Sequence, residues 1–376
     1  MFRFQSFGFT AARTGICLFM TLTSAYGGQT LNAEASTEQI NPNQIHMIVK
    51  TSPQSLYQSE ESWTDKKIVR DLDEAKTSPS YDAALLPDTV ISYESQTGQT
   101  RQWAVTPEGD VVDPIHKQTM MVSSRTKEEL KQHTLALRAK HYGEMLPWKE
   151  ASMALPKYSK FEIIDLESGL RFQGQRRAGS SHADVQPLTK TDSATLKQIY
   201  GGHWSWDRRA VLVRLDGRTI AGSMHGMPHG GDGIPGNDFK GHFCIHFLGS
   251  ETHGSHSIDP AHQVMVHKAA GLLSEYMSKL TPWQLIDVWI AAANQGDLHL
   301  LQAATGQEQA VHVRSMRRLS KFQEQDTSGL LEFETKVEVA ATPERSSKLQ
   351  TRRILFRLER VSPESRWYIR SAQMNK

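Results

Sequence analysis

The residues best suited to chemistry are one cysteine and the histidines around it. In Gly241-His242-Phe243-Cys244-Ile245-His246-Phe247 the thiol has an imidazole two residues away on each side. If this segment is a strand, alternation places His242, Cys244 and His246 on one face and the apolar residues between them against the core. A free thiol has a pKa of about 8.5, and a nearby imidazole that takes its proton makes the sulfur an effective nucleophile. We therefore predict that Cys244 is a catalytic nucleophile.

A second histidine-rich segment lies shortly before the cysteine. It reads Ser223-Met224-His225-Gly226-Met227-Pro228-His229-Gly230 and continues into a glycine-rich loop that ends at Gly241. Glycines let backbone approach a substrate closely, and backbone N–H groups there can stabilise an oxyanion. Ten of the 16 histidines lie between His182 and His267, so the chemistry is expected in this part of the chain.

The two segments together resemble the signature of the YkuD-type L,D-transpeptidases. His225-Gly226 is followed, after fifteen residues that include this glycine, by Gly241-His242-Phe243-Cys244-Ile245-His246. The family has a histidine and then, after a similar interval, Ser/Thr-His-Gly-Cys, an apolar residue, and Asn or Arg. Here Gly241, Phe243 and His246 replace the Ser/Thr, the Gly and the Asn/Arg. The resemblance covers residues 156–275.

The resemblance implies a mechanism. Cys244 would attack the carbonyl of the third residue of a peptidoglycan stem peptide, with His225 as general base and His242 orienting the loop. The terminal D-amino acid would leave, and the thioester would pass to an amine of a neighbouring stem as a cross-link. Transfer to water instead would make the protein an L,D-carboxypeptidase. The mechanism needs no cofactor and no metal.

Several further residues are expected to bind the substrate. By the resemblance, backbone N–H groups at Phe243 and Cys244 would hold the oxyanion, and His246 would stand where the family recognises the substrate carboxylate. Trp206 and Arg209 follow one another closely and could line a groove for the sugar and peptide. The remaining candidates in the glycine-rich segment are Gly226 and His229.

Two other interpretations stay open. In the first, the protein is a zinc-dependent cell-wall peptidase, since zinc peptidases use His and Asp ligands and keep an open position for water. Its ligands would come from His182, Asp184, His242, His246 and Asp259. In the second, the protein only binds the cell wall and has no catalytic role for its thiol.

Charge and the N-terminal residues restrict the partners and the location. The chain has 376 residues and a formal net charge of +2, so no strong basic field indicates a nucleic-acid partner. Residues 1–35 have the pattern of a signal peptide, with Arg3 and Arg13 before an apolar run, Ile16–Leu22, too short to span a bilayer. We expect an exported protein of the periplasm or cell envelope, with no integral membrane segment after cleavage. Cys17 would leave with the signal peptide, and Cys244 would then have no partner for an internal disulfide.

The whole chain is expected to be a multidomain mixed α/β protein. We predict a linker over 36–60, an N-terminal α+β region of unknown role over 61–155, a β-rich catalytic domain similar to the YkuD fold over 156–280, and a domain over 281–376. In the last, a helix precedes long alternating strands such as 333–339, a pattern that resembles the cone-shaped NTF2-like fold.

The elements that would position the site follow from turn and cap signals. Glu167-Ser168-Gly169 and Asp216-Gly217 each separate two apolar runs and predict β-hairpins. Three helices are predicted from their caps. They begin at Thr126 with Glu129 in a capping box, at Asp259 with Pro260, running to about Leu280, and at Thr281 with Pro282, ending near Gly296.

Overall fold

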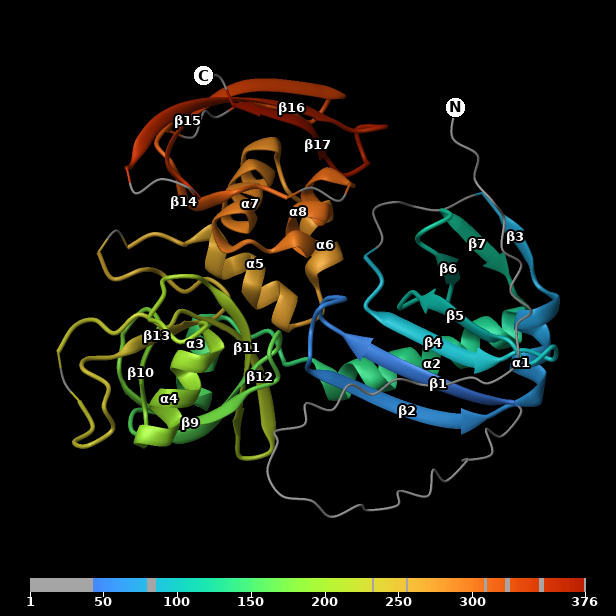
Figure 1. The fold of residues 1–376 in the computed structure, drawn as a ribbon, viewed down its shortest axis with the longest axis horizontal. Coiled ribbons are helices and arrows are strands. Elements are labelled where there is room, and N and C mark those ends of the chain that lie inside the picture. The colour runs from blue at the N-terminus through green and yellow to red at the C-terminus, as the bar shows by residue number, and fades with distance from the viewer. Residues whose placement is uncertain are drawn as a thin grey trace, which may run out of the picture. The chain divides into compact units, whose positions relative to one another are not determined.

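The structure is a computed structural model in which the sheets and helices of the chain are defined. The described residues are 43–79, 86–231, 233–254, 256–307, 310–321, 325–344 and 348–374. The predicted signal peptide, with Cys17, lies outside them. Within them the protein is mixed α/β, as predicted, and contains a seven-stranded sheet, a closed six-stranded barrel and a curled four-stranded half-barrel (Figure 1). No helix in this part of the chain has the length and apolar character needed to cross a membrane.

The first sheet is formed by short strands near the N-terminus of the described chain. Its order is β2 (Gln58–Thr64), β1 (Gln44–Lys50), β4 (Thr89–Glu94), β5 (Thr100–Val105), β6 (Val111–Asp113), β7 (Gln118–Met121) and β3 (Lys76–Ser78). The prediction of a linker over 36–60 is therefore wrong for its second half. Ile45, Met47 and Val49 are fully buried and alternate with the partly buried His46, Ile48 and Lys50, a period-two pattern that the polar composition around the strand obscured.

Two helices accompany this sheet. Asp65 accepts hydrogen bonds from two backbone N–H groups at the start of α1 (Lys66–Glu74). The second helix, α2 (Ser124–His141), begins at Ser123, whose hydroxyl accepts from the Thr126 backbone N–H. The predicted capping box of Thr126 and Glu129 is wrong, because Thr126 is already inside the helix and Glu129 pairs with Arg125. The first core of the protein lies between these helices and the sheet.

The barrel is built entirely from antiparallel pairs. Its closed order is β10 (Ala183–Pro187), β13 (Phe243–His246), β12 (Arg218–Met224), β11 (Arg209–Leu215), β8 (Lys160–Asp165) and β9 (Arg171–Ala178). The two predicted hairpins are present as β8–β9 and β11–β12. Asp216 and Gly217 have φ of 50° and 78°, the left-handed pair that a two-residue hairpin turn requires. Two short helices, α3 (Trp148–Ala154) and α4 (Lys190–Ile199), supply residues to the core of the barrel.

A group of helices follows the barrel in the chain. Asp259 caps α5 (Pro260–Ala269), as predicted, but the helix does not continue to Leu280. Gly271 has a φ of 70°, and the chain starts again as α6 (Leu273–Ser278). Next come α7 (Pro282–Gln295), which has the predicted Thr281 cap and the Gly296 end, and α8 (Leu298–Thr305).

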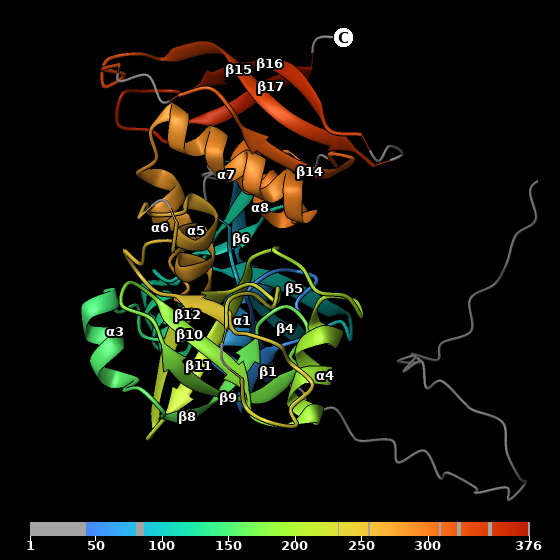
Figure 2. The same cartoon turned by 90° about the vertical axis from the view of Figure 1, so that its left-hand side faces the viewer.

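The C-terminal sheet has the order β14 (Val313–Arg318), β15 (Glu332–Pro343), β16 (Gln350–Glu359) and β17 (Tyr368–Met374), with α7 and α8 along its concave face (Figure 2). Its predicted alternation is confirmed at Phe333, Val337 and Val339, which are buried. The ring of Trp289 on α7 lies edge-on to Phe356 at 5.2 Å. This core is continuous with residues of the barrel strands β8 and β11, so the half-barrel and the barrel share one apolar cluster.

Candidate active site around Cys244

Strand β13 positions the candidate nucleophile. Phe243 and Ile245 point into the barrel core, and Cys244 lies on the opposite face, as alternation predicts. The register pairs Cys244 with Asp184 on β10 and Ile245 with Met224 on β12. Cys244 is 2% exposed, so the sulfur is fixed on a strand with neighbours on both sides.

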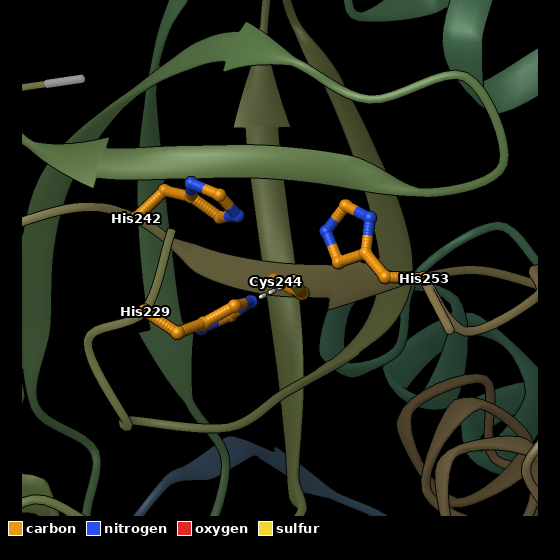
Figure 3. Close-up of side chains that lie close together, drawn as sticks. All are labelled: His229, His242, Cys244 and His253. Carbon is orange, nitrogen blue, oxygen red and sulfur yellow. Dashed lines mark hydrogen bonds between the residues drawn. The ribbon is translucent and has the colours of Figure 1, made fainter. Parts of the chain in front are cut away.

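The thiol has one imidazole within hydrogen-bonding distance. Cys244 Sγ lies 3.3 Å from His229 Nε2, and Figure 3 shows this contact with His242 and His253 on the other sides of the sulfur. His229 Nδ1 lies 3.0 Å from the carbonyl oxygen of Met227, which can only accept, so Nδ1 carries the proton. In the neutral ring the Nε2 lone pair therefore faces the thiol and can accept its proton.

The backbone around His229 is fixed by a bridge to the residue two before the cysteine. The His229 N–H donates to the His242 carbonyl at 3.0 Å, and the His242 N–H donates to the His229 carbonyl at 2.9 Å. Gly241 has a φ of 85°, and a Cβ there would lie 2.2 Å from the His229 oxygen. Glycine is required at this position for both reasons, and the loop from 229 to 242 depends on it.

The predicted base, His225, lies beyond His229. Its ring is 5.2 Å from the His229 ring and 4.7 Å from Trp206, centroid to centroid. Burial, and secondarily the neighbouring His229, lowers the pKa of His225 well below its ordinary value. The imidazole that contacts the thiol is thus His229 and not the predicted His225, a difference of four residues along the same loop.

Asp184 is the acidic centre of the site. Its Oδ1 lies 3.2 Å from His182 Nε2, 3.1 Å from His253 Nε2 and 3.7 Å from His242 Nε2, and 4.0 Å from the sulfur. Burial opposes ionisation of Asp184, but the hydrogen bond to His182 and the charge of nearby histidines hold its pKa below the usual value. The site therefore holds an ionised carboxylate beside the thiol.

The environment keeps the cysteine protonated in the resting state. Burial is the larger cause and the Asp184 charge the second, and together they raise the pKa of the Cys244 thiol above its usual range, against the opposing effect of Arg208. The resting site therefore holds a thiol and not a thiolate, and a reaction at the sulfur would require removal of its proton. His229 is placed to accept it.

A column of stacked histidines lies behind the thiol. His246 is sandwiched between His182, at 4.6 Å, and His262, at 3.7 Å, with interplanar angles of 6° and 8°. His262 Nδ1 in turn lies 2.8 Å from the hydroxyl of Ser223. Burial, and then the neighbouring His182, lowers the pKa of His246 to about 2. His246 is 2% exposed, which does not fit its predicted role in binding the substrate carboxylate.

The other predicted substrate residues divide into one that fits and three with structural roles. Trp206 is 48% exposed and its ring lies 5.2 Å from that of His229. Arg209 instead makes two hydrogen bonds, of 2.9 and 2.6 Å, to the buried carboxylate of Asp165. Phe243 is a core residue, and Gly226 is needed because a Cβ would meet Tyr200 at 2.3 Å.

Two histidines of the cluster were missed by the sequence reasoning. His253 and His262 come from the chain after β13, and neither stands in a motif with Cys244. A signal for His253 was present, because His253-Gly254 repeats the His-Gly pair found at 225–226 and 229–230. His262 is the third residue of α5, so the sequence indicates only that it belongs to the start of a helix.

Two overlapping sets of side chains could hold a metal ion. They are His229, His242, Cys244 and His253, and His182, Asp184, Cys244 and His253. Asp259, one of the predicted ligands, caps α5 and forms an ion pair with Arg208 at 2.6 Å. His246 stacks behind the site, so the ligand set differs from the predicted one.

Comparison with known proteins adds no family to this description: no protein-family model, curated protein or solved structure matches the chain.

Proposed function

We propose that this protein is an exported cysteine acyltransferase that acts on peptidoglycan stem peptides, of the L,D-transpeptidase type. The observation that carries the proposal is the pairing of Cys244 Sγ with His229 Nε2 at 3.3 Å, with His229 held in the accepting tautomer by the Met227 carbonyl. A thiol with a base within hydrogen-bonding distance is the arrangement that covalent catalysis by cysteine uses.

The chemistry runs in two halves. As the sulfur attacks the carbonyl carbon of the stem peptide, the thiol proton passes to His229 Nε2. The imidazolium then returns this proton to the leaving nitrogen, the C–N bond breaks and a thioester remains on Cys244. In the second half an amine of a neighbouring stem attacks the thioester, His229 takes its proton, and the thiol is regenerated as the new amide forms. Water in place of the amine gives carboxypeptidase activity.

The protonated resting thiol suits this sequence. Because burial and Asp184 disfavour the thiolate, proton transfer and attack must occur together, and a base 3.3 Å away makes that feasible. In this account His225 and His242 are positioning residues. His242 holds the backbone of His229, and the rings of His225, His229 and Trp206 pack against one another.

The substrate class rests on the resemblance of His225-Gly226 and 241–246 to the L,D-transpeptidase signature, and on two supporting features. The cysteine belongs to a barrel of antiparallel strands, as the β-rich catalytic domain of that family would require. Trp206 offers an exposed aromatic face beside His229, where a sugar or peptide can pack. The half-barrel with α7 and α8 on its concave face fits the proposed NTF2-like domain.

The test uses the purified protein, a disaccharide-tetrapeptide and EDTA. Intact-protein mass follows the acyl adduct, and chromatography follows D-Ala release and cross-linked product. We expect both to survive EDTA, to disappear in Cys244→Ala, and to persist in His203→Ala, which changes an exposed histidine elsewhere. Turnover that EDTA abolishes and Cys244→Ala retains would instead establish the zinc peptidase. Binding to the wall without turnover in any arm would establish the binding protein.

A further inference from the structure

The site contains more metal-binding side chains than acyl transfer uses. His229 serves the thiol on one side, while on the other His182, Asp184 and His253 converge on the same small volume. His182 Nε2 and His253 Nε2 are 2.8 Å apart, and each is 3.1–3.2 Å from Asp184 Oδ1. With Cys244 Sγ, the four ligand atoms all lie within 4.8 Å of one another.

These separations, from 2.8 Å to at most 4.8 Å, bracket the edge lengths of a small coordination polyhedron. Zinc binds histidine nitrogen and carboxylate oxygen at about 2.0–2.2 Å and thiolate sulfur at about 2.3 Å. Ligand atoms around a tetrahedral ion are therefore about 3.2–3.8 Å apart. One thiol, two imidazoles and one carboxylate are all donors that zinc accepts, in the number that it requires.

The orientation of His182 supports a ligand role independently of the spacing. Its Nδ1 lies 2.6 Å from the carbonyl oxygen of Glu251, so that nitrogen donates and, in the neutral ring, Nε2 presents a lone pair to the cluster. A backbone carbonyl on the far nitrogen is the usual support of a metal-bound histidine. A proton on Nε2 would be donated to the Asp184 carboxylate at 3.2 Å, and a metal ion would replace this hydrogen bond by a bond to each of the two side chains.

Three of the four ligands are rigid and one is open to solvent. His182, Asp184 and Cys244 are 1%, 5% and 2% exposed. His182 directly precedes β10, Asp184 lies in β10 and Cys244 lies in β13. The His253 side chain is 48% exposed and belongs to the loop after β13, which is tied to the barrel by a hydrogen bond from the Glu251 N–H to the Ser181 carbonyl. An ion could therefore enter past His253 into a preformed three-ligand site.

We propose that His182, Asp184, Cys244 and His253 form a binding site for zinc or a similar transition-metal ion. Binding replaces the thiol proton, which passes to solvent, by a metal–sulfur bond. The nucleophile of the proposed acyl transfer is then a metal ligand and cannot attack a substrate. This regulatory consequence rests on the proposed function, whereas the metal site itself does not.

The test of the site uses cobalt as a probe and needs no substrate. Metal-free protein is titrated with Co²⁺ and then competed with Zn²⁺, and absorption reports the ligands. We expect one ion per chain, with a near-ultraviolet band from thiolate-to-cobalt charge transfer that disappears in Cys244→Ser and on addition of zinc. His253→Ala should weaken binding about 100-fold or more, because a ligand is lost. Because the His253 side chain is exposed, we expect this variant to fold, and thermal unfolding checks this.

The control is His203→Ala, which removes an exposed histidine outside the cluster and should leave cobalt binding unchanged. The absence of the charge-transfer band in the wild type, or equal affinity in wild type and His253→Ala, would overturn the site. The regulatory step has its own readout: zinc should protect Cys244 from alkylation and stop thioester formation in wild type, at concentrations that leave His253→Ala sensitive to both. If the protein shows the cobalt band but no acyl transfer, the metal site is supported and the proposed function is rejected.

Discussion

His229 Nε2 and Cys244 Sγ lie 3.3 Å apart although fifteen positions separate the two residues in the chain. The contact exists because the loop between them closes on itself through the paired hydrogen bonds of His229 and His242. The base and the nucleophile are thus held by backbone geometry, and variants that disturb this backbone should act on the chemistry more strongly than on the fold.

Gly241→Ala tests that relationship. A Cβ at Gly241 would lie 2.2 Å from the His229 carbonyl oxygen, so the bridge to His242 must open and His229 must move. We expect thioester formation to fall at least about 10-fold, since small misplacements of a base are costly. The matched control is Gly236→Ala in the same loop, where φ is 79° and no atom lies within 4 Å.

Both glycine variants carry the same left-handed strain of about 1–2 kcal/mol, which urea unfolding would measure. The prediction concerns their difference in rate. If Gly236→Ala slows thioester formation as much as Gly241→Ala does, the bridge has no role in placing His229.

Trp206→Ala tests the only predicted substrate residue that is exposed beside the base. Its ring lies 5.2 Å from His229 and is 48% exposed, so its removal should cost binding more than folding. We expect KM for the disaccharide-tetrapeptide to rise about 10-fold, with kcat within a few-fold, corresponding to about 1.4 kcal/mol. Trp206→Phe should recover part of the loss in steady-state kinetics. A kcat loss with unchanged KM would move Trp206 from binding to catalysis.

Asp165→Asn tests the structural role assigned to Arg209. Asp165 is fully buried and accepts both hydrogen bonds of the Arg209 guanidinium, so the variant leaves a largely buried cation without its counter-charge. We expect a loss of about 3 kcal/mol in the free energy of unfolding, measured with urea. Thioester formation in the folded fraction should be unchanged, and a rise in KM alone would restore Arg209 to the substrate groove.

At acid pH, the free energy of unfolding should depend on His141, a buried histidine outside the site around the thiol. Burial lowers the pKa of His141 to about 4, and His141 is fully buried with its Nδ1 3.0 Å from Ser59 Oγ. A histidine in the unfolded chain has a pKa of about 6.5. Between pH 6.5 and pH 4, His141 is therefore protonated in the unfolded state and neutral in the folded state. Stability contributed by neutral His141 is therefore present above pH 6.5 and is lost as pH falls toward 4, at about 1.4 kcal/mol per pH unit.

Urea unfolding at pH 7 and pH 5 in wild type and His141→Gln measures this contribution. The variant should flatten the pH dependence by about 2 kcal/mol between pH 7 and pH 5, and His312→Gln, which removes an exposed histidine, is the matched control. Equal slopes in wild type and His141→Gln would show that His141 does not remain neutral in the folded protein.

The local parts of the fold could be predicted because neighbouring residues encode them. The Asp216-Gly217 turn, the Thr281 cap and the alternation of Phe243 and Ile245 depend on a few adjacent side chains, and all three are present. The strand at 44–50 was missed because its apolar residues are embedded in polar sequence. The break at Gly271 was missed because it depends on the Tyr142 ring, which a Cβ would meet at 2.5 Å.

The composition of the site could be predicted only in part. Cys244 and its neighbours on one strand face follow from period-two geometry. Which of His225 and His229 contacts the thiol depends on the path of the loop back to β13. Each histidine is followed by a glycine, so the local sequence does not distinguish them. The approach of Asp184 and His253 to the thiol arises from strand pairing and a loop contact across the barrel, which a single sequence does not reveal.

Rapid-quench mass spectrometry of the first turnover would show whether His229 is the base that activates Cys244. The rate of the acyl adduct would be compared in wild type, His229→Gln and His225→Gln, with EDTA present and with circular dichroism to check folding. We expect the rate to fall about 100-fold or more in His229→Gln and much less in His225→Gln. If His225→Gln forms no adduct and His229→Gln forms it at the wild-type rate, then His225 and not His229 is the base.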